Sequence, residues 1–267
     1  MKRSKKKLRL GVWKLTSCDG CQLSLLDCED ELLAITQAVE VAYFMEATSH
    51  AQPGPYDLSL VEGSISTPEQ LEQIKDIRKE SGLLVAIGAC ATSGGIQALR
   101  NYADIEAYKS LVYASPEHIE TLSTSTAISQ HVSVDFELQG CPISKEQLIE
   151  VLVSLLHGKK PTIPNYAVCV ECKLRGTVCL PVSQGRACLG PITQAGCQAL
   201  CPSYNRGCFG CYGPKELSQP SALTEFVRQH RQADDREWLH LLRNYQTGAP
   251  EFHEEGQRHE EENLKKN

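Results

Sequence analysis

The fold is decided by residues 8–22, which read LRLGVWKLTSCDGCQ. The first half is apolar and suits a buried strand, and the second half contains a Cys-x-x-Cys pair, Cys18 and Cys21. A stretch compatible with a helix follows at Cys21–Thr36. A strand that leads through a cysteine-bearing loop into a helix predicts the first unit of an α/β domain.

The same alternation continues over the first ~160 residues. Four further apolar runs predict strands at Val39–Met45, Leu58–Val61, Leu83–Ile87 and Val132–Leu138. Helices are predicted at Pro68–Lys79 and Ser144–Leu156. Strands that alternate with helices indicate a mostly parallel sheet covered on both faces, and the flavodoxin-like arrangement is expected for this size.

The composition changes after His157 and divides the chain into three segments. Residues 1–160 form the expected flavodoxin-like domain. Residues 161–215 hold eight of the thirteen cysteines with little apolar periodicity, so we expect a small irregular domain that needs a non-protein staple. Residues 216–267 are polar, with a short amphipathic helix expected within Leu223–Tyr245 and a frayed acidic end from Glu251.

Bulk properties exclude some functions. The net charge of −6 argues against a nucleic-acid partner, and no apolar run is long enough for a membrane span. The basic start, MKRSKKK, lacks the apolar segment of an export signal and is expected to be a solvated tail of a cytoplasmic protein. In a reducing cytosol, thirteen cysteines point to metal or cluster ligation and not to disulfides.

Four cysteines are expected to meet at one edge of the sheet. Cys18, Cys21, Cys90 and Cys141 each follow a predicted strand, and the carboxyl ends of parallel strands lie at the same edge. They therefore predict a shared four-thiolate site, here called the proximal set. A redox pair at Cys18 and Cys21, or simple buried thiols, are the alternatives, and a redox pair leaves the other two cysteines unexplained.

The eight later cysteines make two more sets of four. They read Cys169-x-x-Cys172, then Cys179 and Cys188, and then Cys197-x-x-x-Cys201-Pro202 and Cys208-x-x-Cys211. Zinc and iron–sulfur clusters both accept four cysteines, so spacing alone leaves both open. The lack of histidine ligands, the Cys201-Pro202 ending and a third four-cysteine site on the same chain favour clusters. Cys28 is left over and is expected to be a packed thiol.

In this order the motifs resemble the small subunit of [NiFe]-hydrogenases, most closely the cytoplasmic kind that includes sulfhydrogenase delta subunits and F420-non-reducing relatives. The resemblance spans roughly residues 8–215. Its motifs are Leu15-Thr-Ser-Cys-Asp-Gly-Cys-Gln22, Val61-Glu-Gly-Ser64, Gly88-Ala-Cys90-Ala, Gly140-Cys-Pro142, Cys188-Leu-Gly-Pro191 and Gly207-Cys-Phe-Gly-Cys-Tyr-Gly-Pro214.

The resemblance implies three clusters, one on each set of four. The order of cysteines in the family implies a distal set of Cys169, Cys172, Cys179 and Cys188 and a medial set of Cys197, Cys201, Cys208 and Cys211. Membrane-linked members place a histidine where this chain has Cys169 and have three medial cysteines, so all three clusters are expected to be [4Fe–4S]. The implied partners are a nickel–iron large subunit beside the proximal set and iron–sulfur and flavin subunits linked to NAD(P). The chain would carry electrons and hold no nickel–iron site.

The resemblance also implies a role for Glu62. By resemblance Glu62 lies near the subunit interface, on a possible proton path; the alternative is a strand-end carboxylate bonded to backbone amides.

Three rival functions stay open. One rival is the 20-kDa-type subunit of respiratory complex I, which has adjacent cysteines where this chain has Cys18-Asp-Gly-Cys21. The others are a zinc-stapled interaction module and a stand-alone ferredoxin.

Overall fold

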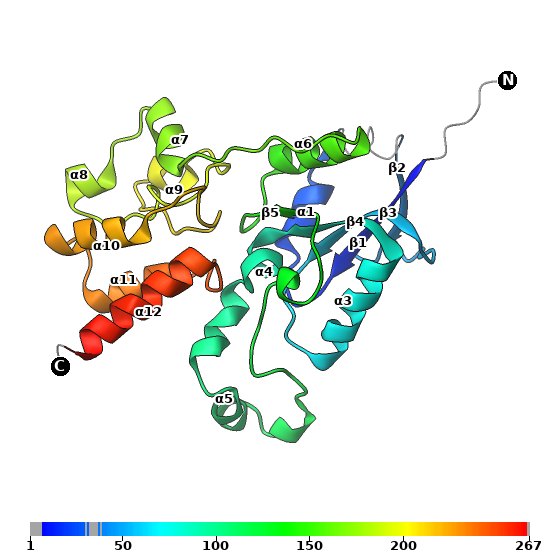
Figure 1. The fold of residues 1–267 in the computed structure, drawn as a ribbon, viewed down its shortest axis with the longest axis horizontal. Coiled ribbons are helices and arrows are strands. Elements are labelled where there is room, and N and C mark those ends of the chain that lie inside the picture. Colours follow the sequence, from blue (N-terminus) through cyan, green and yellow to red (C-terminus); the bar gives the residue numbers. More distant parts are fainter. Residues whose placement is uncertain (1–6, 30, 32–36, 38, 266–267) are drawn as a thin grey trace.

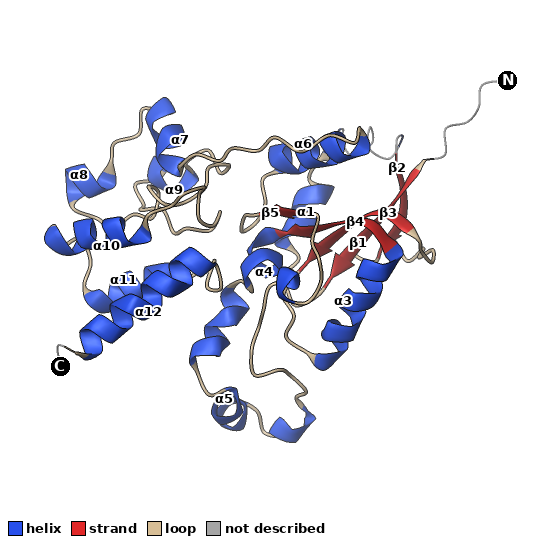
Figure 2. Cartoon of the chain, in the orientation of Figure 1, coloured by secondary structure: helices blue, strands red, loops and turns tan. Residues whose placement is uncertain are grey.

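The computed structural model describes residues 7–29, 31, 37 and 39–265. They form a parallel sheet covered by helices and a second lobe of short helices and loops (Figure 1, Figure 2). The basic residues 1–6, and residues 30 and 32–36 of the first predicted helix, lie outside the described part of the chain.

Five parallel strands lie in the order β2-β1-β3-β4-β5. Their bounds are β1 Leu8–Lys14, β2 Val39–Phe44, β3 Tyr56–Glu62, β4 Ser81–Ile87 and β5 Phe136–Leu138. The central pair runs in register from Leu10 opposite Leu58 to Lys14 opposite Glu62. This order is that of flavodoxin-like sheets, so the predicted fold class is confirmed.

Helices connect the strands of this sheet. Their bounds are α1 Gly20–Leu26, α3 Pro68–Glu80, α4 Gly88–Ser93, α5 Ile105–Val112 and α6 Lys145–Leu156, with 3-10 turns η1 Ile96–Tyr102, η2 Pro116–His118 and η3 Ile128–Gln130. Two predicted helix starts are capped as their sequence suggests. The Thr67 hydroxyl accepts from Gln70 N at 3.3 Å, and the Ser144 hydroxyl accepts from Gln147 N at 3.3 Å.

Each face of the sheet has its own apolar core. Leu25 of α1 and Leu148 of α6 pack on one face with the buried side chains of β1 and β3. Ile74 and Ile77 of α3 pack on the other. The sheet is therefore buried on both sides, which leaves its carboxyl edge as the place where loops and polar groups collect.

The C-terminal lobe differs from the expected coreless domain with a frayed tail. Its helices are α7 Val168–Leu174, α8 Leu180–Gln184, α9 Leu200–Ser203, α10 Pro220–Gln229, α11 Asp235–Leu242 and α12 Pro250–Leu264. Trp238 and Phe252 are each 1% exposed and share one core with Val168 and Leu189 of the cysteine-rich segment. The expectation of a frayed end was wrong for residues 250–264, because Phe252 anchors α12 in this core.

The connection between α11 and α12, residues 243–249, joins the two lobes and is here called the strap (Figure 1). Gly248 N donates to Ser93 O of α4 at 2.9 Å. The Arg243 guanidinium lies over the Tyr102 ring, 4.0 Å from its centroid. The Tyr102 hydroxyl also bonds His253 Nδ1 at 2.7 Å. The cysteine lobe is thus fastened to the helix that follows β4.

Candidate functional site

The proximal set lies together at the carboxyl edge of the sheet, as the sequence predicts. Cys18 follows β1, Cys21 lies in α1, Cys90 lies in α4 directly after β4, and Cys141 follows β5. The pKa of the Cys90 thiol is raised to about 11, mainly by burial and in part by the neighbouring Cys141 and Cys18, while a hydrogen bond with Gln97 opposes the rise. The thiols of Cys18, Cys90 and Cys141 therefore interact electrostatically, although they come from three separate strand ends.

Glycines leave room around these sulfurs. A Cβ on Gly88 would overlap Cys21 Sγ, and a Cβ on Gly95 would lie 2.7 Å from Cys90 Sγ. Both residues have left-handed backbones, with φ of 86° and 62°. Only glycine combines this conformation with such a close approach, so the backbone keeps a cradle open beside the thiols.

Glu62 holds the loop that carries the first two cysteines. It is 1% exposed at the end of β3, and its two carboxylate oxygens accept from Cys21 N and Gln22 N, each at 3.1 Å. Burial raises the pKa of Glu62, and the two amides oppose that rise. Glu62 is therefore bonded to backbone amides, as one of the two expectations had it, and its interface or proton-path role stays a prediction.

Gln97 is a neighbour of the proximal set that no sequence motif indicated. Its Nε2 donates to Thr16 O at 3.0 Å, and Cys90 Sγ lies 3.4 Å from its Oε1. It comes from η1, a turn that follows two glycines and carries no periodic apolar signal. An amide beside a ligand sulfur is the kind of neighbour that orients the ligand.

The distal set gathers around α7 and α8. Cys169 and Cys172 lie in α7, Cys179 precedes α8 and is exposed, and Cys188 follows it. Burial raises the pKa of Cys169 to about 11, with further contributions from Cys188, Cys172 and Cys179. All four thiols line one small cavity of about 50 Å³. The structure therefore places Cys179 and Cys188 beside the Cys-x-x-Cys pair.

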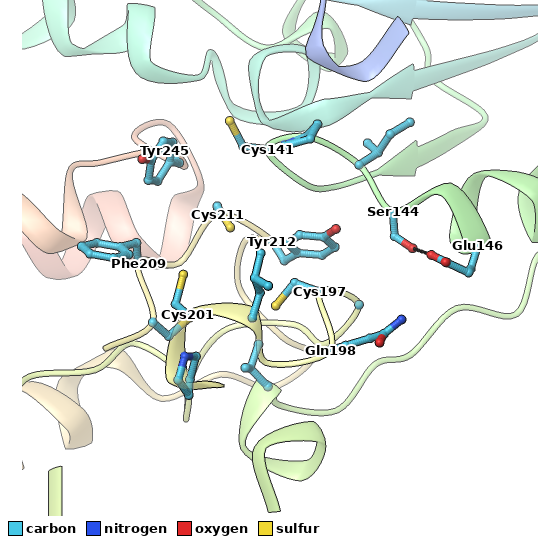
Figure 3. A pocket seen from close by; sticks show the side chains of 17 residues that line it. Cys141, Ser144, Glu146, Cys197, Gln198, Cys201, Phe209, Cys211, Tyr212 and Tyr245 are labelled. Atoms are coloured by element: carbon cyan, nitrogen blue, oxygen red, sulfur yellow. Dashed lines mark hydrogen bonds between the residues drawn. The ribbon is translucent and has the colours of Figure 1, made fainter. Parts of the chain in front are cut away.

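The medial set lines a larger cavity of about 350 Å³ between the lobes (Figure 3). Its four members are Cys197, Cys201, Cys208 and Cys211, and Cys141 of the proximal set reaches the same cavity. Burial raises the pKa of Cys211 to about 12, and the thiols of Cys197, Cys141 and Cys201 add to the rise. The proximal and medial sets therefore lie on either side of one space.

Two further contacts organise the cysteine lobe. The carboxylate of Glu171 accepts from Gly196 N at 2.9 Å and from Ala199 N at 3.1 Å, so it holds the loop that bears Cys197 as Glu62 holds the proximal loop. Cys208 N donates to Cys188 Sγ at 3.1 Å. This bond joins the medial set to the distal set, and the three sets follow one another through the molecule.

Cys28 stands apart from the three sets. It is fully buried, its thiol donates to Ser24 O at 3.4 Å, and burial raises its pKa. It is a packed thiol within the α/β core. Within residues 7–29, 31, 37 and 39–265, no three His, Cys, Asp or Glu side chains lie close enough to hold a single metal ion.

Comparison with known proteins identifies the family. The family model "NADH ubiquinone oxidoreductase, 20 Kd subunit" matches residues 18–155, which carry the proximal set. Sulfhydrogenase 2 subunit delta of Pyrococcus furiosus is 41% identical over 222 residues, covering 83% of this chain and 93% of that protein. The chain belongs to the hydrogenase small-subunit branch of this family.

Other relatives of this hydrogenase small subunit agree. The iron-sulfur subunit of the F420-non-reducing hydrogenase of Archaeoglobus profundus is 26% identical, and the match covers 78% of the chain and 82% of that protein. A chain in the crystal structure of an NAD+-reducing [NiFe]-hydrogenase in the H2-reduced state is 30% identical, with a TM-score of 0.55, and covers 60% of the small subunit and 96% of its own length. The predicted resemblance to hydrogenase small subunits is confirmed. The complex I rival shares the α/β domain, whereas the hydrogenase match extends into the cysteine lobe.

The sequence also predicts that no segment of the chain spans a membrane. Among the described residues, none of the helices is long and apolar enough to span a membrane.

Proposed function

We propose that the chain is the electron-transfer subunit of a cytoplasmic [NiFe]-hydrogenase and carries three [4Fe–4S] clusters, one on each of the proximal, medial and distal sets. The observation that carries this proposal is the succession of the three sets: the first two share a cavity, and Cys208 N bonds the sulfur of Cys188 in the third. Membership of the hydrogenase small-subunit family supports the same function.

The residues present fit clusters. Every predicted ligand is a cysteine, the donor that iron–sulfur clusters take, and Gly88 and Gly95 keep space beside the sulfurs that a Cβ would fill. Zinc would draw four sulfurs to about 2.3 Å from one ion. The medial thiols instead surround about 350 Å³. This space favours a bulky inorganic core over the zinc-stapled alternative.

When bound, the clusters would supply one-electron redox chemistry over a wide range of potentials. The chain's own residues position the ligands for it. Glu62 and Glu171 fix the loops of Cys21 and Cys197 through backbone amides, and Gln97 lies beside Cys90. Cys21, Cys188 and Cys208 are buried from water, and exclusion of water, with hydrogen bonding to sulfur, is how a protein tunes a cluster.

Exposed apolar side chains on α1 and η1, elements that contain or follow proximal cysteines, favour a partner there. Leu23 of α1 is 54% exposed, and Ile96 and Leu99 of η1 are 53% and 44% exposed. Exposed apolar side chains near a functional site are typical of a subunit interface. We assign this face to the nickel–iron large subunit, so that hydrogen chemistry takes place on the partner and this chain is not catalytic by itself.

We assign the point at which electrons leave the chain to the distal set, because Cys179 is exposed at the surface. Iron–sulfur and flavin subunits that serve NAD(P) are the proposed acceptors, supported by the likeness to a chain of an NAD+-reducing [NiFe]-hydrogenase. All thirteen cysteines are free thiols, which suits a reducing cytoplasm.

Metal analysis of the complex purified without oxygen tests the proposed function. Three [4Fe–4S] clusters require about twelve iron and twelve sulfide per chain. The dithionite-reduced protein should give EPR signals of interacting reduced clusters. A colourless protein with about three zinc ions and no EPR signal would show that the zinc-stapled alternative is correct.

Iron retention should weaken as the pH falls. Burial raises the pKa of Cys169 and Cys90 to about 11 and that of Cys211 to about 12, so the metal-free thiols hold their protons at neutral pH. Each ligand must lose a proton to bind iron, and each pH unit lost costs about tenfold in affinity per released proton. Iron transfer to a chelator, timed between pH 6 and 8.5, should therefore speed up towards the acid end. Rates that stay level or rise with pH would contradict this.

A further inference from the structure

An aromatic residue outside every cysteine motif lines the cavity that Cys141 shares with the medial set. Cys141 lines the cavity on the side of the α/β domain, and Cys201 and Cys211 line it on the side of the cysteine lobe. Tyr245 of the strap lines the same cavity. Figure 3 shows its ring next to Cys141 and Cys211, on the other side of Cys211 from Tyr212.

Tyr245 lines the cavity together with cysteines of both sets. Burial raises its pKa, and the thiols of Cys141, Cys211 and Cys201 raise it further. Tyr245 thus has neighbours on either side of the gap, one of them from a different lobe of the molecule.

The strap fixes Tyr245 from both sides. On the medial side, Gln246 Nε2 donates to Cys211 O at 3.0 Å. On the proximal side, Gly248 N donates to Ser93 O at 2.9 Å, three residues after Cys90. Gln246 and Thr247 are 2% and 1% exposed, so these anchors are shielded from water. The strap therefore ties the α4 helix of one site to the Cys211 loop of the other.

We propose that Tyr245 is a positioning residue that seals the gap between the proximal and medial sites against water and keeps their separation fixed. This inference rests on the proposed function. One electron passes across the gap, so that one site is oxidised as the other is reduced, and no bond or proton changes place. A ring positioned by the anchored backbone of the strap would keep this gap dry and of low dielectric constant, where solvent would otherwise alter the potentials of both sites.

The decisive variants are Tyr245→Ala and Tyr245→Phe in the complete hydrogenase complex, with Tyr204→Ala as a matched control. Tyr204 is 75% exposed, three residues from Cys201, and does not line the cavity. Two readouts are taken on protein of full iron content. Pulsed EPR in D2O measures exchangeable deuterons near the reduced centres, and hydrogen-dependent dye reduction measures turnover.

Tyr245→Ala should add a deuteron signal from water in the gap and lower dye reduction about tenfold, which corresponds to a barrier about 1.4 kcal/mol higher. Tyr245→Phe and Tyr204→Ala should match the native complex in both readouts. If the alanine variant does not assemble, Tyr245→Leu carries the same test, because it removes the ring and keeps apolar bulk.

An alanine variant with native deuteron signal and native turnover would overturn the proposal. So would a phenylalanine variant as impaired as alanine, because the hydroxyl and not the ring would then be responsible. A native complex with no iron–sulfur EPR signal would instead refute the proposed function, so the two failures are distinguishable.

Discussion

Replacing Cys141 by alanine should abolish hydrogen-dependent electron transfer. Cys141 belongs to the proximal set and also lines the cavity of the medial set, so its loss removes a ligand at the junction of the two sites. Mutations of residues that contact a metal ligand, without binding the metal themselves, already cost about 10- to 100-fold in metal affinity or activity. We therefore expect hydrogen-dependent dye reduction to fall by at least about a hundredfold.

The matched control is Cys28→Ala, which removes a buried thiol that belongs to none of the three sets. Its cost should be about 1 kcal/mol of folding free energy, as for an average core substitution, with iron content and dye reduction close to native. Dye reduction at the native rate in the Cys141 variant would show that Cys141 is not a ligand of the proximal site. Inactivity of the Cys28 variant at full iron content would show that the sets are divided wrongly.

Replacing Trp238 by alanine should strip iron from the cysteine lobe while leaving the proximal site filled. Trp238 is 1% exposed, its indole N–H donates to Thr224 Oγ1 at 3.0 Å, and it packs in the core that contains Cys188 and Cys208. Truncating a buried tryptophan costs about 3–5 kcal/mol. A lobe of this size has little stability to spare, so its loops should open and lose the medial and distal iron.

Iron counts after gel filtration check this result: about four iron per chain should remain of the twelve expected, since each [4Fe–4S] cluster holds four. Leu217→Ala is the control, because Leu217 is 84% exposed at the edge of the same lobe and its truncation should change neither iron content nor melting temperature. Full iron content in the Trp238 variant would mean that the cysteine loops are held without the C-terminal helices.

The α/β domain could be predicted closely because its signals are local and strong. The five apolar runs that alternate with capped helices each appear as a parallel strand, and the Cys-x-x-Cys after the first run lies at the carboxyl edge. The convergence of Cys90 and Cys141 follows from that topology alone. Residues 88–112 gave no periodic pattern from which their helices could be predicted, because α4 and η1 are short and separated by the adjacent Gly94 and Gly95.

The C-terminal helices could not be predicted with the same success. Each short helix contributes only one to four buried residues, such as Val227 of α10, Trp238 of α11 and Phe252 of α12. The sequence predicts one amphipathic helix within Leu223–Tyr245, and the structure has the two helices α10 and α11 there. These helices pack against non-periodic cysteine loops, so the apolar pattern alone does not give their number or bounds. Tyr245 lies in a connection between two such helices, and only the folded chain brings it to Cys141 and Cys211.

The strap also has a consequence for the order in which the molecule is completed during synthesis. The distal and medial cysteines are neighbours in sequence, whereas the proximal set needs Cys18 and Cys141 to meet across most of the first domain, a long-range contact that forms slowly. In a chain that folds from its N-terminus as it leaves the ribosome, residues 243–249 emerge after every predicted ligand. The step that locks the lobes together therefore comes only after all twelve predicted ligands have emerged, which leaves an interval in which assembly factors can reach each site.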